Sequence, residues 1–408
     1  MKSVLFLINP NSHDNDEMLS LISTAGYKNL GVFSQNLKEV NKSYYIGSGK
    51  VKELAANIFL IEDKDPVKVI FNVELNATQK RNLEDELGYE VLDRTELIIE
   101  IFERSAKTVE AKLQVEIAKY RYMASRLVDK EANYSQVTSG SGHNKGEGEK
   151  EKELTRRQLS AAIRQKKQKL EKIKNSRKTA RSKRISSAIP VIAIVGYTNV
   201  GKSTLMNALL ELSHKVDSKN VLVEDKLFAT LETSSRLIDI YGFPPFIITD
   251  TVGFISNLPH FLVESFKSTL EEIKDADYLL HVHDISSNMM SEENDAVNKV
   301  LDEIGVDGIP IIDVFNKSDR LKYTPFLKDT FITTFKDKEE VRDVVNYIWD
   351  TISKNWERKI INVPYEYDFR TLEHDNFVIE KINKKDGIKA TVRFNPVYKY
   401  KYKEFFMN

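Results

Sequence analysis

Short apolar runs alternate with helical patterns over residues 1 to about 105. Two runs have the continuous apolar character of buried strands, Val4–Ile8 and Val67–Val73. Two stretches repeat their apolar residues at helical spacing, Lys50–Ile61 and Asn76–Leu87, the second with an N-terminal Asn-x-x-Gln pattern typical of a capping box. This alternation predicts a small parallel α/β domain.

The next segment carries narrow apolar seams with spacings of three and four residues. The first seam consists of Leu113, Ile117, Tyr120, Ala124 and Leu127. The second consists of Leu159, Ile163, Leu170 and Ile173, with Lys166 interrupting it. A Gly-rich stretch, residues 139–148, separates the two. Heptad-like seams joined by such a linker predict an antiparallel helical hairpin with a mobile tip.

The second arm of this hairpin is strongly basic. From Arg156 to Arg184 there are thirteen Lys and Arg residues and one acidic residue, Glu171. Solvated helix faces usually mix charges of both signs, so the pattern favours contact with a phosphate backbone over a merely solvated face.

Residues 187–357 show a longer α/β pattern, and residues 358–408 are short, β-like and rich in Lys and Tyr. The strict alternation over Tyr398–Lys403 predicts an edge strand with one aromatic and one charged face, with nucleic-acid stacking as the alternative. Four domains are therefore expected, at residues 1–105, 106–186, 187–357 and 358–408. The predicted fold class is α/β, with a small α+β domain at the C-terminus.

An apolar strand, Ile192–Val195, leads directly into a phosphate-binding motif. The motif G-x-x-x-x-G-K-S is complete, as Gly196, Tyr197, Thr198, Asn199, Val200, Gly201, Lys202 and Ser203. A helical pattern follows, which is the context that the motif requires. Backbone N–H groups of this P-loop can surround phosphate oxygens. We expect Lys202 to reach the β- and γ-phosphates and the Ser203 hydroxyl to bind Mg²⁺.

A second strand ends in D-x-x-G. Its motif residues are Asp250, Thr251, Val252 and Gly253. Asp250 is the second candidate for holding Mg²⁺, and the Gly253 amide can bond the γ-phosphate and so report its presence. The motif is weak alone, but its place about fifty residues after a P-loop strengthens it.

A third strand ends in N-K-x-D, which indicates which base is bound. Its residues are Asn316, Lys317, Ser318 and Asp319. The Asp319 carboxylate can accept from both guanine N1–H and the 2-amino group, whereas adenine offers neither donor there. Asn316 and Lys317 would brace the loop and cover the ring. The three motifs in this order predict a P-loop GTPase.

The remaining Mg²⁺ ligand is expected from a polar stretch typical of a switch loop. That stretch contains Phe228, Ala229, Thr230, Leu231 and Glu232. Thr230 is the candidate ligand, with Thr233 as the alternative. Lys202, Thr230 and Gly253 are thus the catalytic candidates, and Ser203, Thr230 and Asp250 the metal ligands.

The group that activates water is not obvious. Many GTPases orient water with a Gln after the D-x-x-G glycine, but this chain has Phe254. We therefore expect slow intrinsic hydrolysis. Asn199 matches the P-loop asparagine of potassium-activated GTPases, so K⁺ beside the phosphates is a further expected cofactor. A second glycine-rich segment, Gly47-Ser48-Gly49-Lys50, lacks the full P-loop pattern and predicts a turn before a helix.

Composition narrows the remaining possibilities. The 408 residues contain 61 basic and 61 acidic side chains and no cysteine, so disulfides and thiolate sites are excluded. The seven histidines form no recognisable metal cluster along the chain, and the alternation of His281 and His283 is typical of a strand. No apolar run approaches the length of a membrane span. We expect a cytoplasmic monomer with no membrane partner.

These motifs together resemble the HflX family of translational GTPases, and the resemblance covers nearly the whole chain. It rests on the P-loop G-Y-T-N-V-G-K-S, on Leu227–Glu232, on Asp250–Ile255 with Leu258–His260 and Ser268–Glu272, and on Tyr45–Val51, Gln79–Leu83, Leu92–Thr95, Lys112–Glu116 and Pro364-Tyr365. It implies a factor that binds the large (50S) ribosomal subunit and splits stalled or idle 70S ribosomes in its GTP form. The hairpin tip would approach 23S rRNA, and some relatives are associated with resistance to ribosome-targeting antibiotics or with ATP binding by the N-terminal domain.

Two segments depart from the family pattern. The hairpin tip reads Lys145-Gly146-Glu147-Gly148-Glu149 where the family has R-G-P-G-E. The last guanine loop lacks the usual S-A, and Thr333 and Thr334 are the candidates in its place. Two other functions stay open: a large-subunit assembly GTPase, which would prefer immature particles, and an RNA chaperone, which would bind RNA whatever the nucleotide.

Overall fold

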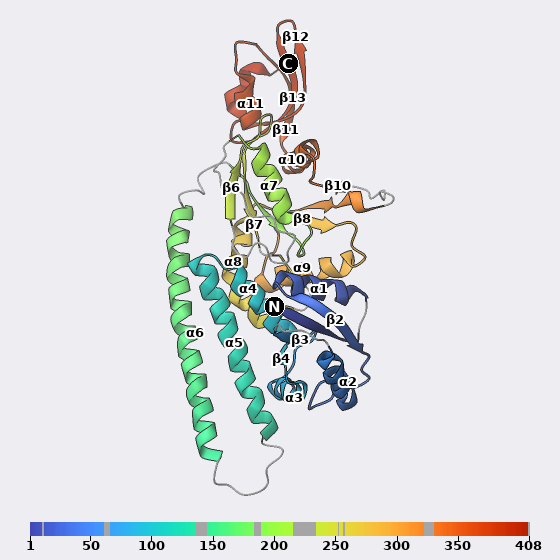
Figure 1. Ribbon diagram of the computed structural model, residues 1–408. Coiled ribbons are helices and arrows are strands. Elements are labelled where there is room, and N and C mark those ends of the chain that lie inside the picture. The colour runs from blue at the N-terminus through green and yellow to red at the C-terminus, as the bar shows by residue number, and fades with distance from the viewer. Residues whose placement is uncertain are drawn as a thin grey trace. The chain divides into compact units, whose positions relative to one another are not determined.

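The computed structural model describes residues 1–9, 12–60, 66–134, 145–182, 189–214, 234–251, 253–255, 258–321 and 330–406 (Figure 1). Within these residues the chain forms two compact units. The first comprises the described residues up to 179 together with 258–267, and the second comprises the remainder.

A parallel sheet forms the centre of the first unit. Its strands are β1 (Lys2–Ile8), β2 (Lys28–Gln35), β3 (Val67–Phe71) and β4 (Glu90–Leu92), in the order β2-β1-β3-β4. The accompanying helices are α1 (Ser12–Thr24), α2 (Ser48–Phe59), α3 (Ala77–Leu87) and α4 (Arg94–Ser105). The predicted capping box is present, since Asn76 Oδ1 accepts from the Gln79 amide at 2.8 Å and the Gln79 side chain accepts from the Asn76 amide. The predicted parallel α/β domain is confirmed.

Two long helices follow, α5 (Val109–Tyr134) and α6 (Lys145–Ser182), and they lie side by side (Figure 1). Lys166, which interrupts the apolar seam, has its ammonium 2.5 Å from Glu116 on α5 and 5.4 Å from the centre of the Tyr120 ring. The polar position is therefore satisfied across the hairpin. The linker prediction was too long, because the backbone from Lys145 onward is helical; residues 135–144 lie outside the described chain.

A buried carboxylate on α4's N-terminal side helps to anchor α5. Asp93 is fully buried and caps α4 by accepting from the Glu96 amide at 2.8 Å. It also accepts from the Tyr122 hydroxyl at 2.9 Å and pairs with Arg126, both on α5. One side chain thus starts one helix and holds the next against the α/β domain.

Helix α8 (His260–Leu270) follows the D-x-x-G motif in the chain, and its residues up to 267 belong to the first unit. Phe266 packs edge-on against Phe102 of α4, with ring centres 4.7 Å apart. Arg121 of α5 forms a 2.7 Å ion pair with Glu264 and also donates to the Phe261 carbonyl. These contacts hold α8 against α4 and α5.

The second unit contains a mixed sheet. Its described strands are β5 (Val191–Val195), β6 (Ser234–Ile238), β7 (Phe246–Asp250), β8 (Tyr278–Asp284), β9 (Ile311–Asn316) and β10 (Phe331–Ile332), in the order β10-β9-β8-β5-β7-β6. Only β6 of these runs antiparallel to its neighbour. The helical segments are α7 (Lys202–Leu212), η1 (Glu271–Asp275), α9 (Met290–Ile304), η2 (Ser318–Arg320) and α10 (Lys338–Ile352). Order and direction are those of a P-loop GTPase domain, as predicted.

The C-terminal residues of the second unit form a small antiparallel sheet in the order β11-β13-β12. Its elements are β11 (Glu357–Val363), α11 (Phe369–Asp375), β12 (Phe377–Lys384), β13 (Gly387–Phe394) and η3 (Lys399–Phe405). The edge strand predicted at Tyr398–Lys403 was wrong, because the segment is a 3₁₀ helix. Tyr402 is fully buried and donates to Asp375 at 2.6 Å, whereas Tyr400 is 71% exposed. The alternation therefore reflects one anchoring tyrosine rather than a pleated strand.

None of the helices in the described part of the chain is both long and apolar enough to cross a membrane. The domain boundaries at 105, 186 and 357 stay predictions.

Candidate nucleotide site

The P-loop connects β5 to α7 in the second unit. Gly196 and Gly201 have φ angles of 148° and 105°, which L side chains rarely adopt. A Cβ at Gly196 would lie 2.4 Å from the Val282 carbonyl oxygen, and one at Gly201 would lie 2.2 Å from Asn316 Nδ2. Any side chain at either glycine would clash with these neighbouring atoms, so both positions require glycine. The loop backbone can therefore curve tightly at the start of α7.

Lys202 is the first residue of α7 and is buried. Its ammonium donates to the carbonyl oxygens of Gly196 at 2.9 Å and Tyr197 at 2.5 Å. The ammonium therefore lies against the P-loop, where a bound phosphate would also lie. Burial lowers the pKa of Lys202 to about 8, while the charge of Asp250 opposes that shift and the charge of Lys317 adds to it. A bound polyphosphate would favour the charged form further.

Strand β7 brings the D-x-x-G residues to the P-loop. Asp250 is fully buried at the end of the strand, and the Thr251 hydroxyl donates to the Ile194 carbonyl at 2.6 Å. At Gly253 a Cβ would lie 2.8 Å from Thr198 Cγ2 and 3.1 Å from the Lys202 ammonium. Gly253 is therefore adjacent to the lysine that would hold the γ-phosphate, as its proposed sensing role requires.

Phe254 stands at the sequence position where many GTPases have a catalytic glutamine, but it cannot perform that function. Its ring is 2% exposed, and its backbone bonds to the P-loop in both directions, from Thr198 N to its carbonyl at 2.7 Å and from its amide to the Gly196 carbonyl. A buried phenyl ring cannot orient water, which supports the expectation of slow intrinsic hydrolysis.

The N-K-x-D residues lie at the end of β9 and form a brace for the P-loop. Asn316 is buried and donates from Nδ2 to the Val200 carbonyl at 2.7 Å. The Ser318 amide donates to the Thr333 carbonyl at 3.2 Å, which brings the Thr333–Thr334 segment beside the motif. Asp319 lies in the short η2 helix with its side chain 32% exposed. The predicted base-recognition residues are thus gathered at one edge of the sheet.

Two supporting residues, Asp284 and Lys336, were missed by the motif analysis. Asp284, at the end of β8, pairs with Lys317 at 2.7 Å and fixes a lysine whose φ is +64°. Lys336 pairs with Asp319 at 2.5 Å and lowers the pKa of that carboxyl, mainly through the hydrogen bond it donates. Asp284 could have been found as the polar residue ending a strand next to β9; nothing in the sequence marks Lys336.

Some predicted site residues lie outside the described chain. They are Phe228, Ala229, Thr230, Leu231, Glu232, the alternative ligand Thr233, and Val252.

Comparisons with known proteins agree with this geometry. Residues 12–103, 105–184 and 191–317 match the profiles described as GTP-binding GTPase N-terminal, GTP-binding GTPase Middle Region and 50S ribosome-binding GTPase. The GTPase HflX of Caldanaerobacter subterraneus subsp. tengcongensis is 39% identical over 96% of this chain and 90% of the relative. The chain belongs to the HflX family of GTPases. The GTPase HflX of Escherichia coli K12 is 39% identical over 78% of this chain and 72% of that protein.

A solved structure is also similar. The crystal structure of SsGBP in complex with GDP has a TM-score of 0.50 and 25% identity, and the match covers 87% of this chain and 99% of that one. Membership of the family makes this protein a GTP hydrolase, in agreement with the P-loop and the N-K-x-D loop.

The donors beside the P-loop suit magnesium. Ser203 follows Lys202 at the start of α7, and Asp250 is a fully buried carboxylate whose charge acts on Lys202. Both would offer oxygen ligands, which the hard Mg²⁺ ion prefers. Ser203 and Asp250 would hold Mg²⁺ there with the nucleotide, where it would neutralise charge on the β- and γ-phosphates. Lys202 would bind the same oxygens, and the Gly253 amide would bond the γ-phosphate.

A histidine cluster lies on β8 and β9 of the same sheet. The strand predicted for His281 and His283 is confirmed, and β8 pairs with β9 so that His281 lies opposite Asp313. Asp313 Oδ1 is 2.9 Å from His283 Nε2 and 3.6 Å from His281 Nδ1. Burial, together with the neighbouring His283, lowers the pKa of His281 to about 3. The sequence analysis missed this cluster, because only strand pairing brings Asp313 to the two histidines.

Proposed function

We propose that this GTPase binds the large ribosomal subunit and, in its GTP form, splits stalled or idle 70S ribosomes. The observation that supports this most directly is the basic outer face of α6. Its described basic residues are exposed, apart from Lys166 in the seam, and comprise Arg156, Arg157, Arg164, Lys167, Lys169 and Lys172. Glu153 and Glu171 are the acidic residues among the described side chains of this helix.

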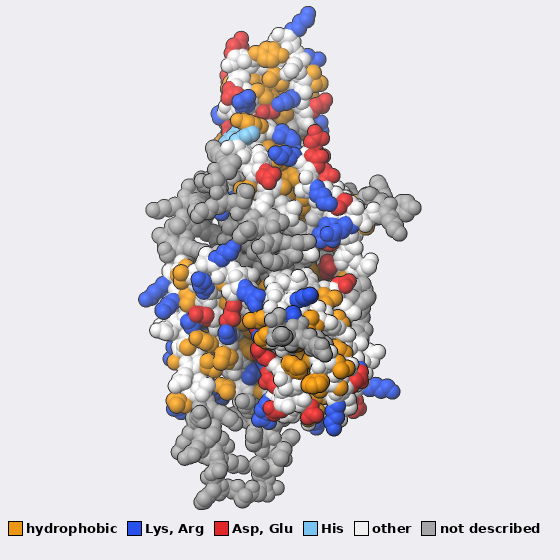
Figure 2. Space-filling model, in the orientation of Figure 1, with side chains coloured by type: hydrophobic (Ala, Val, Ile, Leu, Met, Phe, Trp, Pro, Cys, Tyr) orange, Lys and Arg blue, Asp and Glu red, His pale blue; other side chains and the backbone are white. Residues whose placement is uncertain are grey.

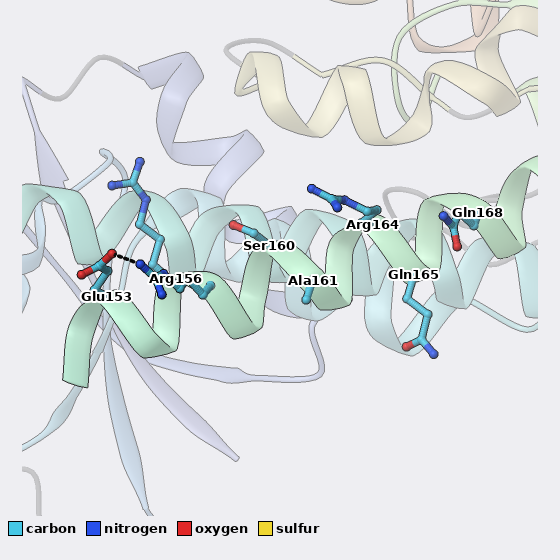
Figure 3. Close-up of a pocket in the computed structure, with 8 residues that line it drawn as sticks. Glu153, Arg156, Ser160, Ala161, Arg164, Gln165 and Gln168 are labelled. Atoms are coloured by element: carbon cyan, nitrogen blue, oxygen red, sulfur yellow. Dashed lines mark hydrogen bonds and ion pairs between the residues drawn. The ribbon is translucent and has the colours of Figure 1, made fainter. Parts of the chain in front are cut away.

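One face of α6 is slightly hollowed. Figure 3 shows the residues that line a hollow of about 580 Å³ on it: Glu153, Arg156, Arg157, Ser160, Ala161, Arg164, Gln165 and Gln168. Their spacing of three and four residues places them on one side of the helix, away from the seam at Leu159, Ile163 and Leu170. Arginine and glutamine donors with small residues between them suit a phosphate backbone, which the arginines can bind through paired donors.

In the space-filling view, Lys and Arg side chains are mixed with Asp and Glu side chains over much of the visible face (Figure 2). Because the whole chain has no net charge, any attraction to nucleic acid must come from a local concentration of basic residues, and α6 carries one. We infer that the hairpin contacts 23S rRNA and that the GTPase domain makes this contact nucleotide-dependent.

The test is sedimentation of purified 70S ribosomes through sucrose gradients with the protein and a non-hydrolysable GTP analogue, GDP or an ATP analogue. Conversion to subunits with the GTP analogue alone, with the protein on the large subunit, is expected. The Lys202→Ala variant, which lacks the phosphate-binding ammonium, is the control and should leave 70S intact. Intact 70S with wild-type protein would overturn the proposal; binding only to immature large subunits would point to assembly, and nucleotide-independent RNA binding to a chaperone.

We further propose that the altered tip, Lys145–Glu149, adapts the protein to ribosomes carrying an antibiotic. The change from the family's R-G-P-G-E to K-G-E-G-E removes a proline and adds a carboxylate. Restoring Glu147→Pro and Lys145→Arg should lower the drug concentration that inhibits growth of cells expressing the protein. An unchanged inhibitory concentration would count against this role.

A further inference from the structure

The cluster of His281, His283 and Asp313 contains the ligand types of a transition-metal site. One ligand atom from each residue lies within 4.8 Å of those of the other two. Two imidazoles and a carboxylate are a donor set that binds Zn²⁺ with a water in the fourth position. A hard ion such as Mg²⁺ would prefer oxygen ligands, so this cluster differs in kind from the Ser203–Asp250 pair.

The distances are close to those that zinc needs. In a tetrahedral site with bonds of about 2.0–2.1 Å, ligand atoms are about 3.3 Å apart. Asp313 Oδ1 lies 2.9 Å from His283 Nε2 and 3.6 Å from His281 Nδ1, which brackets that separation. The third separation, between the two histidine nitrogens, is at most 4.8 Å, so small side-chain movements would convert the hydrogen-bonded cluster into a coordination site.

The two imidazoles are held in place by packing. His281 and His283 are 4% and 7% exposed, and their ring centres are 3.9 Å apart. The His283 ring also stacks on Phe315, with centres 4.6 Å apart and planes inclined by 15°. Because both residues point to the same face of β8, the backbone itself places the two nitrogens side by side.

Asp313, the third candidate ligand, connects the buried histidines to solvent. The Asp313 side chain is 50% exposed, so its carboxylate can adjust and an ion can enter from solvent. With two buried imidazoles and one exposed carboxylate as ligands, the fourth coordination position would face solvent and could be taken by water. A hydrogen-bonded cluster with no metal affinity is the competing explanation, and it predicts a different response to substitution.

We propose that His281, His283 and Asp313 bind one divalent transition-metal ion, with zinc as the probe of choice. The site lies on β8 and β9, whose ends carry Asp284 and the N-K-x-D loop, and its ligands are different residues from Ser203 and Asp250, which would hold the nucleotide's Mg²⁺.

The test uses full-length protein that has been stripped of metal and reloaded with GDP and excess Mg²⁺, so that the nucleotide site is occupied. Zinc affinity is measured by competition with a chromogenic chelator. Co²⁺ titration then reports nitrogen ligation through its visible absorption. The variants are Asp313→Asn, at a half-exposed position that should not affect folding, and His283→Gln. The matched control is His374→Gln, an exposed histidine whose Nδ1 lies 3.5 Å from Asp375 Oδ1.

Wild type and His374→Gln are expected to bind one zinc ion with equal affinity. Asp313→Asn and His283→Gln should each weaken it at least about tenfold, the lower end of what loss of even an outer-shell partner costs. GDP affinity reports folding, and if His283→Gln loses it, Asp313→Asn alone decides. No zinc binding by wild type, or equal affinity in wild type and Asp313→Asn, would overturn the proposal.

Discussion

At the scale of single residues, the nucleotide site depends on side chains that hold other side chains. Asp284 holds the ammonium of Lys317, the residue expected to cover the base, and Asn316 braces the P-loop by donating to the Val200 carbonyl. Asp319 is different, since its partner Lys336 is 70% exposed. The carboxylate can therefore exchange Lys336 for the donors of a base. Recognition and support are therefore divided between neighbouring residues of one motif.

The Asp319→Asn variant should exchange guanine for xanthine specificity. An amide can accept only one of the two guanine donors, so GDP affinity should fall about 10–150-fold, as for the loss of one hydrogen bond to a charged group. Xanthine has a carbonyl in place of the 2-amino group, to which the new amide can donate. Calorimetric titration with GDP and XDP checks this, with Asp313→Asn on the preceding strand β9 as control. Unchanged GDP affinity would remove Asp319 from the base site.

Asn199 gives a second test at this scale. Its φ of +63° is a left-handed conformation that Asn tolerates, and the residue is exposed within the phosphate loop. We expect hydrolysis to be about tenfold or more faster in K⁺ than in Na⁺, which needs only about 1.4 kcal/mol of transition-state stabilisation. Asn199→Ala should abolish the difference, and Asn298→Ala, at an exposed position on α9, should keep it. Equal wild-type rates in both salts would count against a potassium site.

At the scale of elements, local patterns acquire their meaning from what they pack against. Lys166 interrupts the seam of α6, yet it faces Glu116 and Tyr120 and so belongs to the hairpin interface. The Tyr-Lys alternation near the C-terminus forms a 3₁₀ helix because Tyr402 is drawn into the core by Asp375 and by the Thr371 carbonyl.

Removing one hydroxyl from that core should destabilise the C-terminal sheet. Tyr402→Phe leaves a buried carboxylate without its 2.6 Å donor, and we expect a loss of about 1.5–3 kcal/mol, the usual value for a bond to a charged group. Hydrogen–deuterium exchange of β13 measures the change locally. The exposed Tyr400→Phe variant should have almost no effect. Equal protection in both variants would show that the Tyr402 hydroxyl adds no stability.

The exposed face of α6 allows a charge test. Arg164→Glu reverses one charge in the hollow of Figure 3 and should weaken ribosome binding and reduce the salt dependence of that binding. Arg358→Glu, at an exposed position on β11, is the matched control. Binding measured across a series of KCl concentrations gives both quantities. Equal losses in the two variants would mean that α6 has no special part in binding RNA.

At the scale of the whole molecule, the D-x-x-G motif is followed along the chain by a segment that packs against the hairpin helix α5. Gly253 lies beside Lys202, and residues 258–267 begin five positions later and pack with α4 and α5 in the first unit. A displacement of Gly253 on γ-phosphate binding would therefore pull on a segment held by Arg121 and Phe102.

Weakening that hold should uncouple nucleotide from ribosome. Arg121→Ala removes the pair with Glu264, and we expect nucleotide affinity to stay while the difference in splitting between GTP analogue and GDP decreases several-fold, as for a coupling energy of about 1–3 kcal/mol. Lys112→Ala, an exposed position on α5, is the control. Sedimentation of 70S ribosomes supplies the measurement, and an unchanged difference would argue against coupling through α8.

Much of this protein is determined by local sequence. The three motifs, their strands and the capping box at Asn76 follow from residues within a few positions of one another, because steric and hydrogen-bonding demands there are local. Contacts between segments that are distant in the sequence could be identified only from the tertiary structure. Strand pairing brings Asp313 to His281 and His283, and packing joins Lys166 to Glu116 and Tyr402 to Asp375. Burial of a polar group depends on which partner the fold supplies, and no local pattern contains that partner.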